Sequence, residues 1–421
     1  MDELAMLRAE TPLVKLRQRE REAERLSQAG DGWGALRMRQ EALALAKVHK
    51  VAAARGSPSY PMLLSTTHYK LAQAYAELGC VAQAGEHCQH AMDHLPLHGG
   101  SLEPVARFKG QVNVLLGEAL LQGGAPKPQV ALQHFLAAGG VDRLEQVGDL
   151  GLRVACCQCY ALMGGAKLAQ ARATREARQR LGDAVAGVEA RLGEAERKGS
   201  GVDRTALAQR LGDLRAEEAE EGAFETQLAG EAEAALSRAM DCLYEAVTEE
   251  QDRLEKGMSR EEARQHPLVS TLWRQVCEIG VQLAAVHGLR GNLKAQQKQL
   301  DEVISAHSTY SLPAPLVARV LKEQGAVLVE LKRYDDALKA YNELLELQAE
   351  RYADDTPRAA VARAECFKLV GDVYVAKRQF NRAREHFGAA LELFSLHLGS
   401  RNPLVLDLEH RLDQLRGYTE A

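Results

Sequence analysis

Aromatic residues, prolines and long apolar runs are all scarce in this chain. Its 421 residues include 2 Trp, 11 Tyr, 7 Phe and 12 Pro, fewer than the strands and turns of an all-β protein require. The longest uncharged apolar stretch runs only from Ile279 to Leu289, whereas a membrane-spanning helix needs about 20 apolar residues. An all-β fold and membrane insertion are therefore excluded, and an α/β fold is strongly disfavoured.

A large excess of either charge is also missing. The 53 basic and 58 acidic residues leave a formal net charge of −5, which is too balanced to indicate a nucleic-acid-binding protein. The N-terminal segment MDELAMLRAETPLVKLRQRER has no charged and then apolar leader. We therefore expect the 8 cysteines to be reduced thiols of a soluble intracellular protein.

Strong helix formers dominate the chain instead, and one spacing of small and large residues recurs in it. A small residue is followed by alanine 12 positions later, by a larger residue at 16 positions and by alanine or leucine at 19. The three sets are Ala72, Ala84, Cys88 and Ala91; Gly325, Ala337, Tyr341 and Leu344; and Gly371, Ala383, Phe387 and Ala390. Small residues let two antiparallel helices approach closely, and the large residue fills the space between hairpins. Each hairpin leaves an apolar face that only a neighbouring hairpin can bury, so the units should stack.

Weaker copies of the spacing extend the pattern over most of the chain. They begin at Ala23, at Gly117 with Phe135 after a two-residue insertion, at Cys157 with Tyr160, Gly164 and Ala169, and less securely near Val281. The pattern resembles the tetratricopeptide repeat, with repeats longer than the usual ~34 residues. Prolines stand at or just before the expected helix starts, namely Pro61, Pro104, Pro267, Pro315, Pro357 and Pro403. The predicted fold is an all-α, tetratricopeptide-repeat, right-handed superhelical solenoid with a long charged helical insertion.

The insertion divides the chain into three predicted parts. Residues 1–177 carry the N-terminal repeats, and residues 266–421 carry the C-terminal repeats and a cap helix that ends near Tyr418. Residues 178–265 are polar and break the rhythm, so they predict long helices joined by a turn at Lys198–Asp203. A projecting helical hairpin and two overgrown, degenerate repeats explain this stretch equally well. Its apolar positions are too sparse to predict a coiled coil.

The order of the repeats carries a family resemblance. HYKLAQAYAELG, VARFKGQVNVLLGEALLQ with ALQHFLAA, and the C-terminal GDVYVAKRQFNRAREHFGAALELFSLHLGSRNP together look like the tetratricopeptide repeat protein 23 family. The likeness covers about residues 15–140 and 315–415. It implies a non-enzymatic ciliary or flagellar scaffold of the cytoplasm and cytoskeleton, with axonemal or transport proteins as partners. The linkers HPLVSTL and LGSRNPLVLDL resemble those of kinesin light chain and support an alternative, a cytosolic cargo or motor adaptor.

Catalytic motifs are absent from the sequence. It contains no Gly-Lys dipeptide and therefore no P-loop, and neither a G-x-S-x-G elbow nor an H-E-x-x-H pair. Cys156, Cys157 and Cys159 fall at expected packing positions rather than at a metal site. His87, His90 and His94 share one helix face and form a weak candidate site for Zn²⁺ or another divalent ion, as in a metal-dependent enzyme. The alternative is a face that is exposed or lies against a loop. We expect no enzyme activity, cofactor or small-molecule substrate.

Protein binding is the usual function of stacked hairpins, whose first helices line a concave surface. Side chains one residue after the small position, or three before it, should point to that surface. The candidates are Tyr69, Gln73, Val114, Glu118, Lys322, Lys368 and Asp372. The alternative for each of them is a solvated position without a partner.

Overall fold

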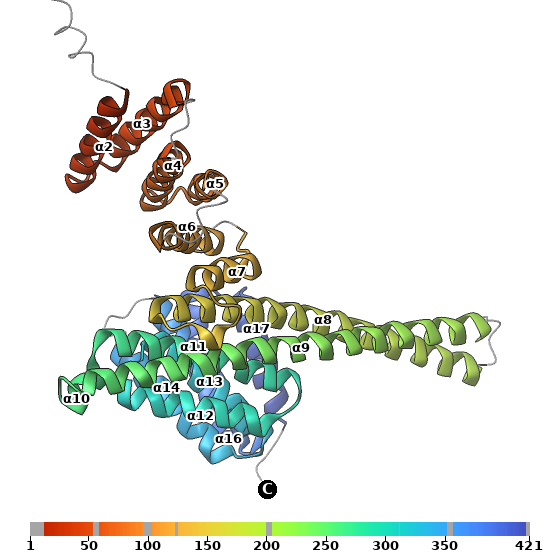
Figure 1. Ribbon diagram of the computed structural model, residues 1–421. Helices are drawn as coiled ribbons and strands as arrows, with labels where there is room; N and C mark the ends of the chain where they lie inside the picture. Colours follow the sequence, from red (N-terminus) through yellow and green to blue (C-terminus); the bar gives the residue numbers. More distant parts are fainter. Residues whose placement is uncertain are drawn as a thin grey trace, which may run out of the picture. The chain divides into compact units, whose positions relative to one another are not determined.

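The chain is an all-α, tetratricopeptide-repeat-like solenoid of helical hairpins, as the spacing predicts. Every regular element of the described residues is helical (Figure 1). Two compact units can be distinguished, Met1–Met163 and Gly164–Ala421. The computed structural model describes residues 12–53, 59–95, 103–122, 125–198, 204–310, 312–351 and 357–417.

The first unit is built from three hairpins followed by the start of a long helix. Each hairpin packs on the next, since α3 contacts α4 and α5 contacts α6. Leu16, Leu43 and Leu71 are buried in the core of the first two hairpins, and Ala72, Cys88 and Leu116 in that of the second and third. Its elements are α2 (Pro12–Gln28), α3 (Gly32–Ala53), α4 (Ser59–Glu77), α5 (Val81–Asp93), α6 (Glu103–Gln122), α7 (Pro128–Gly139) and the 3-10 turn η1 (Leu144–Gln146).

The turn after several first helices repeats one backbone conformation. Seven positions after the small residue, Gly30, Gly79, Lys332 and Arg378 have φ of 83°, 72°, 60° and 59°. The next amide then donates back to the helix, as from Cys80 N to the carbonyl oxygen of Tyr75 at 2.8 Å. This left-handed C-terminal cap satisfies the last carbonyl groups and reverses the chain within two or three residues.

The second unit contains the long helices, three further hairpins and a cap helix. Pro267, Pro357 and Pro403 occupy the first position of their helices, as expected from their missing N–H. The cap helix α17 ends at Leu415, and Tyr418 lies outside the described residues. The elements are α8 (Leu150–Lys198, which begins in the first unit), α9 (Arg204–Glu255), α10 (Arg260–Gln265), α11 (Pro267–Leu289), α12 (Leu293–Tyr310), α13 (Ala314–Glu330), α14 (Tyr334–Arg351), α15 (Pro357–Ala376), α16 (Phe380–Leu398) and α17 (Pro403–Leu415).

One repeat predicted from the spacing is wrong. The copy at Cys157, Tyr160, Gly164 and Ala169 is not a hairpin, because all four residues lie in the uninterrupted helix α8. Gly164 instead makes room for α9, since a Cβ at position 164 would stand 2.5 Å from Cγ of Leu236. A glycine that permits close packing and a glycine that ends a helix look alike in a sequence. The predicted boundary between residues 177 and 178 likewise falls inside α8.

The distal parts of α8 and α9 form a long antiparallel pair, which we call the arm (residues 177–198 and 204–224; Figure 1). Val185, Leu211 and Leu214 form its own small apolar cluster. At its base, the carboxylate of Glu225 lies 2.8 Å from Arg175 and 3.0 Å from Arg178. The stretch 178–265 therefore consists mainly of one pair of long helices. Of the predicted turn at Lys198–Asp203, residues 199–203 lie outside the described residues.

Candidate protein-binding faces

Four predicted binding residues lie on first helices of the first unit, and three of them, Tyr69, Gln73 and Glu118, lie close together. Tyr69 and Gln73 lie on α4, and Val114 and Glu118 on α6. The Tyr69 ring meets Phe108 edge-on, with 5.3 Å between ring centroids. The Gln73 side chain lies within hydrogen-bonding reach of the Tyr69 hydroxyl. An aromatic ring held in one orientation beside an amide is a suitable contact for a partner protein.

The electrostatics of this face centre on Glu118. Burial raises the pKa of Tyr69, and the nearby Cys88 and Glu118 raise it further. Burial also raises the pKa of Cys88 to about 12, with Glu118 as the second cause, so these three side chains converge. Partial burial raises the pKa of Glu118 itself. No ion pair to Glu118 occurs within the described part of the chain, which leaves its carboxylate open to a donor from a partner.

The three predicted residues of the second unit already have partners inside the chain. Lys322 on α13 pairs with Glu365 on α15 at 3.0 Å. Lys368 on α15 pairs with Asp407 on α17 at 3.1 Å. These contacts connect successive first helices and the cap helix, so here the first-helix face contributes to stacking.

Asp372 is the third of these residues, and it also contacts the cap helix. Its carboxylate lies 2.5 Å from Arg411. Burial raises the pKa of Asp372, while Arg411 and Lys368 act in the opposite direction. We did not predict the partners Asp407 and Arg411 from the sequence, although the opposite charges four residues apart at 368/372 and 407/411 match one another.

His87 and His90 of α5 and its C-cap residue His94 meet a fourth histidine, His68 of α4, which the sequence pattern does not predict. Its ring centroid lies 5.1 Å from that of His87, 5.2 Å from that of His90 and 5.5 Å from that of His94. His90 is exposed, but His87 is half-buried and stacks on Tyr75 at 5.4 Å. The prediction of an exposed or loop-facing surface is therefore wrong for His87, which lies against α4.

This histidine cluster is not arranged as a metal centre. Nδ1 of His68 and Nδ1 of His87 are 2.9 Å apart, which is a hydrogen-bond distance. Among the described residues, no three His, Cys, Asp or Glu side chains are placed so that they could hold a metal ion. Burial, together with the charges of His87, His90 and His94, lowers the pKa of His68 to about 4. Burial also lowers the pKa of His87, so both rings of this hydrogen-bonded pair are neutral at neutral pH.

The cysteines occupy packing positions. Cys156, Cys157 and Cys159 are buried, and all eight thiols of the chain are free. Burial raises the pKa of Cys159 to about 12. A thiol with so high a pKa is a poor nucleophile and a poor metal ligand.

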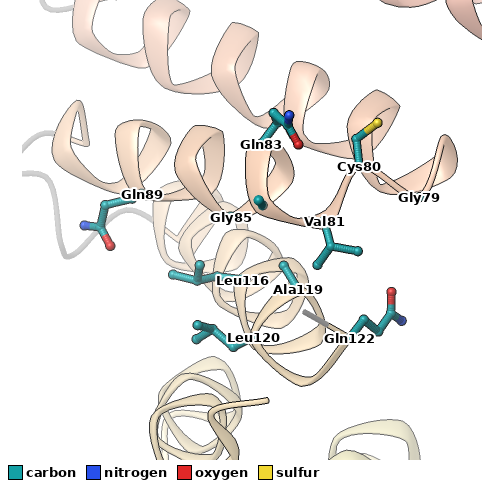
Figure 2. Close-up of a pocket in the computed structure, with 11 residues that line it drawn as sticks. Gly79, Cys80, Val81, Gln83, Gly85, Gln89, Leu116, Ala119, Leu120 and Gln122 are labelled. Atoms are coloured by element: carbon teal, nitrogen blue, oxygen red, sulfur yellow. The ribbon is translucent and has the colours of Figure 1, made fainter. Parts of the chain in front are cut away.

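A neutral groove lies along part of the α5/α6 contact in the first unit (Figure 2). Its volume is about 640 Å³, and Val81 and Gly85 of α5 face Leu116 and Ala119 of α6 across it. Small residues create the space, since a Cβ at Gly85 would still lie 4.0 Å from the Ala119 methyl group. None of the described residues that line the groove carries a charge.

Comparisons with known proteins give no family. No family model matches the chain, and no curated protein matches it. Among solved structures, BtubC (BKLC) from P. vanneervenii is 16% identical over 57% of this chain and 94% of its own, with a TM-score of 0.30. The TPR domain of P58(IPK) is 12% identical over 95% and 98%, with a TM-score of 0.26. The apo form of RapI is 8% identical over 95% and 97%, with a TM-score of 0.29.

Because these TM-scores are low, the assignment of the architecture rests on the helices observed in this chain. The helices also bear on membrane insertion. None of them, within the described residues, is long and apolar enough to cross a membrane.

Proposed function

We propose that this protein is a non-enzymatic scaffold or adaptor that holds partner proteins on the first-helix face of its first unit. A stack of tetratricopeptide-like hairpins suggests protein–protein interaction in general. The observation that favours this face is that Glu118 has no ion pair within the part of the chain that the structure describes. Its carboxylate lies beside Tyr69 and has no ion pair in the described residues, whereas Lys322, Lys368 and Asp372 of the second unit have intramolecular partners.

The proposed setting is the cilium or flagellum, with axonemal or transport-associated proteins as partners in the cytoplasm and cytoskeleton. This part of the proposal is supported by the sequence resemblance to the tetratricopeptide repeat protein 23 family. The alternative is a cytosolic cargo or motor adaptor, which the kinesin-light-chain-like linkers favour. Neither function requires a cofactor, a nucleic acid or a small-molecule substrate.

Proximity labelling by a fusion of the full chain in ciliated cells tests both points. We expect ciliary proteins to be enriched and the fusion to localise to the cilium. Glu118→Lys should abolish the enrichment by reversing the charge beside Tyr69, while Lys322→Ala, which removes only an exposed ion pair, should preserve it.

Other outcomes would contradict specific parts of the proposal. An even cytoplasmic distribution excluded from the cilium would overturn the ciliary setting, and enrichment of kinesin heavy chain would favour the motor adaptor. Identical partners for wild type and Glu118→Lys would show that the α4/α6 face is not the binding face.

A further inference from the structure

The arm carries a groove of its own, remote in sequence from the α4/α6 face. Its volume is about 700 Å³, and Ala177 and Leu181 of α8 line it together with Phe224 of α9. The Phe224 side chain is 50% exposed. Beside the groove, this half-exposed ring offers apolar surface that a partner could cover.

Acidic side chains surround this apolar strip on the α9 side. Glu217, Glu220 and Glu221 line the groove, within about two helical turns before Phe224. Within the described residues, none of the three takes part in an ion pair or a side-chain hydrogen bond. Their negative charges are therefore available to a partner.

The basic residues of α8 do not neutralise these glutamates. Arg175 and Arg178 are paired with Glu225. Arg180 reaches the groove but lies 3.8 Å from Glu176 on its own helix. The groove thus combines an apolar floor with a negative rim, which repels nucleic acids and anionic lipid surfaces.

We propose that this groove docks a basic amphipathic helix of a partner protein. Apolar residues on one face of such a helix would pack on Phe224 and Leu181, as in other helix-in-groove complexes. Lysines or arginines one turn apart would reach Glu217 and Glu220, because residues three or four apart share a helix face. The inference rests on the proposed adaptor function only in that the ligand is a protein, and it adds a second site with a defined partner chemistry.

The test uses a fluorescein-labelled peptide of about 18 residues of leucine and lysine, with the leucines on one helical face. Fluorescence anisotropy with the purified full chain should show saturable binding that weakens as salt is added. Phe224→Ala and Glu220→Lys should each weaken binding at least about tenfold. Matched controls on the same helix are Tyr244→Ala, which changes an aromatic residue that is 52% exposed, and Glu245→Lys, which changes an exposed acid. Both should bind like the wild type.

Several results would overturn the proposal. These are the absence of binding to the wild-type chain, an equal loss in the two control variants, and equal binding of a leucine–glutamate peptide or of a scrambled leucine–lysine peptide. Circular dichroism of each variant separates lost binding from lost folding. Glu118→Lys should bind the peptide normally, so failure of the arm site and failure of the α4/α6 face are distinguishable.

Discussion

Gly371 on α15 lies directly against the ring of Phe387 on α16, so closely that a Cβ at position 371 would stand 2.5 Å from two of the ring carbons. The same relationship joins Gly117 to Phe135, where the distance from the built Cβ would be 2.7 Å. Phe135 and Phe387 are among the largest fully buried side chains of the chain. In these hairpins the aromatic ring fills the space that the absent side chain of glycine leaves.

Gly371→Ala should therefore destabilise the C-terminal hairpin, although alanine is the better helix former. Overpacking of a core costs about 1–3 kcal/mol, and the gain in helix propensity is about 1 kcal/mol. We expect a net loss of up to about 2 kcal/mol, because the methyl group meets a ring that has no room to move. Urea unfolding followed by circular dichroism measures this change in the free energy of unfolding, and hydrogen exchange of α15 and α16 shows whether it affects this hairpin.

Gly388→Ala is the matched control for this prediction. Gly388 lies in the interior of α16, one residue after Phe387, and a Cβ there would meet nothing within 4 Å. This substitution should stabilise the hairpin by up to about 1 kcal/mol through helix propensity alone. If both glycines respond alike, close packing of Gly371 on Phe387 is not what selects glycine.

The hairpins could be predicted because their determinants are local. Gly325 and Tyr341, or Gly371 and Phe387, are separated by 16 residues, so a fixed spacing connects the two sides of one interface. The starts of α11, α15 and α17 were predictable for the same reason, since each begins with a proline.

The remaining features depend on contacts between distant parts of the chain. Position 164 needs a glycine because Leu236 packs against it. Leu236 is distant in the sequence, so the local spacing suggests a turn at Gly164 although α8 continues through it. His68 belongs to the histidine cluster because α4 lies against α5, not because of its own neighbours in the sequence. The ion pair of Lys368 with Asp407 is not predictable from local spacing, because it forms only once the cap helix has docked.

His68 should make the first unit sensitive to acid. It is 4% exposed, and burial lowers its pKa from 6.5 to about 4, with protonated His87, His90, His94 and Lys47 opposing its charge. A pKa below the unfolded value favours the neutral imidazole in the folded state. Its stabilisation is fully present above about pH 6.5 and is lost as the pH falls toward 4. The shift corresponds to about 3 kcal/mol.

His68→Gln removes this titration and tests the assignment. Hydrogen exchange of the α4–α5 amides, compared at pH 7 and pH 4.5 after correction for the intrinsic rate, should show a smaller loss of protection in the variant. His397→Gln changes an exposed histidine and should retain the full acid response. An unchanged response in His68→Gln would assign the effect to other groups.

The base of the arm should depend on the two arginines that face Glu225. The carboxylate of Glu225 is 5% exposed, so the combined changes Arg175→Met and Arg178→Met would leave a buried charge without a partner. Breaking a buried pair in this way costs about 3–5 kcal/mol. We expect faster proteolysis and faster hydrogen exchange in α8 and α9, while α15–α17 remain protected.

Arg215→Met provides the comparison on the same arm. It removes the 2.6 Å pair with Glu189, whose partners are 60% and 45% exposed, and an exposed pair contributes about 0–1 kcal/mol. Exchange of the arm should hardly change. An effect as large as that of the double variant would mean that total charge, rather than burial of Glu225, determines the stability of the arm.

Thiol labelling should separate Cys80 from Cys88, although both belong to the α4–α5 hairpin. Burial raises the pKa of Cys88 to about 12 from its ordinary 9.0, which lowers its thiolate fraction at neutral pH about a thousandfold. Cys80 is only half-buried, in the turn before α5.

Brief treatment with iodoacetamide at pH 7.5, followed by mass spectrometry, should modify Cys80 first. Cys88, Cys277 and Cys366 should react only after unfolding, because burial raises the pKa of all three thiols to about 11 or 12. In concentrated urea all eight thiols should react at similar rates. Equally rapid labelling of Cys80 and Cys88 in the folded protein would mean that α5 does not pack on α4 and α6 as observed, since only that packing keeps water and reagent away from Cys88.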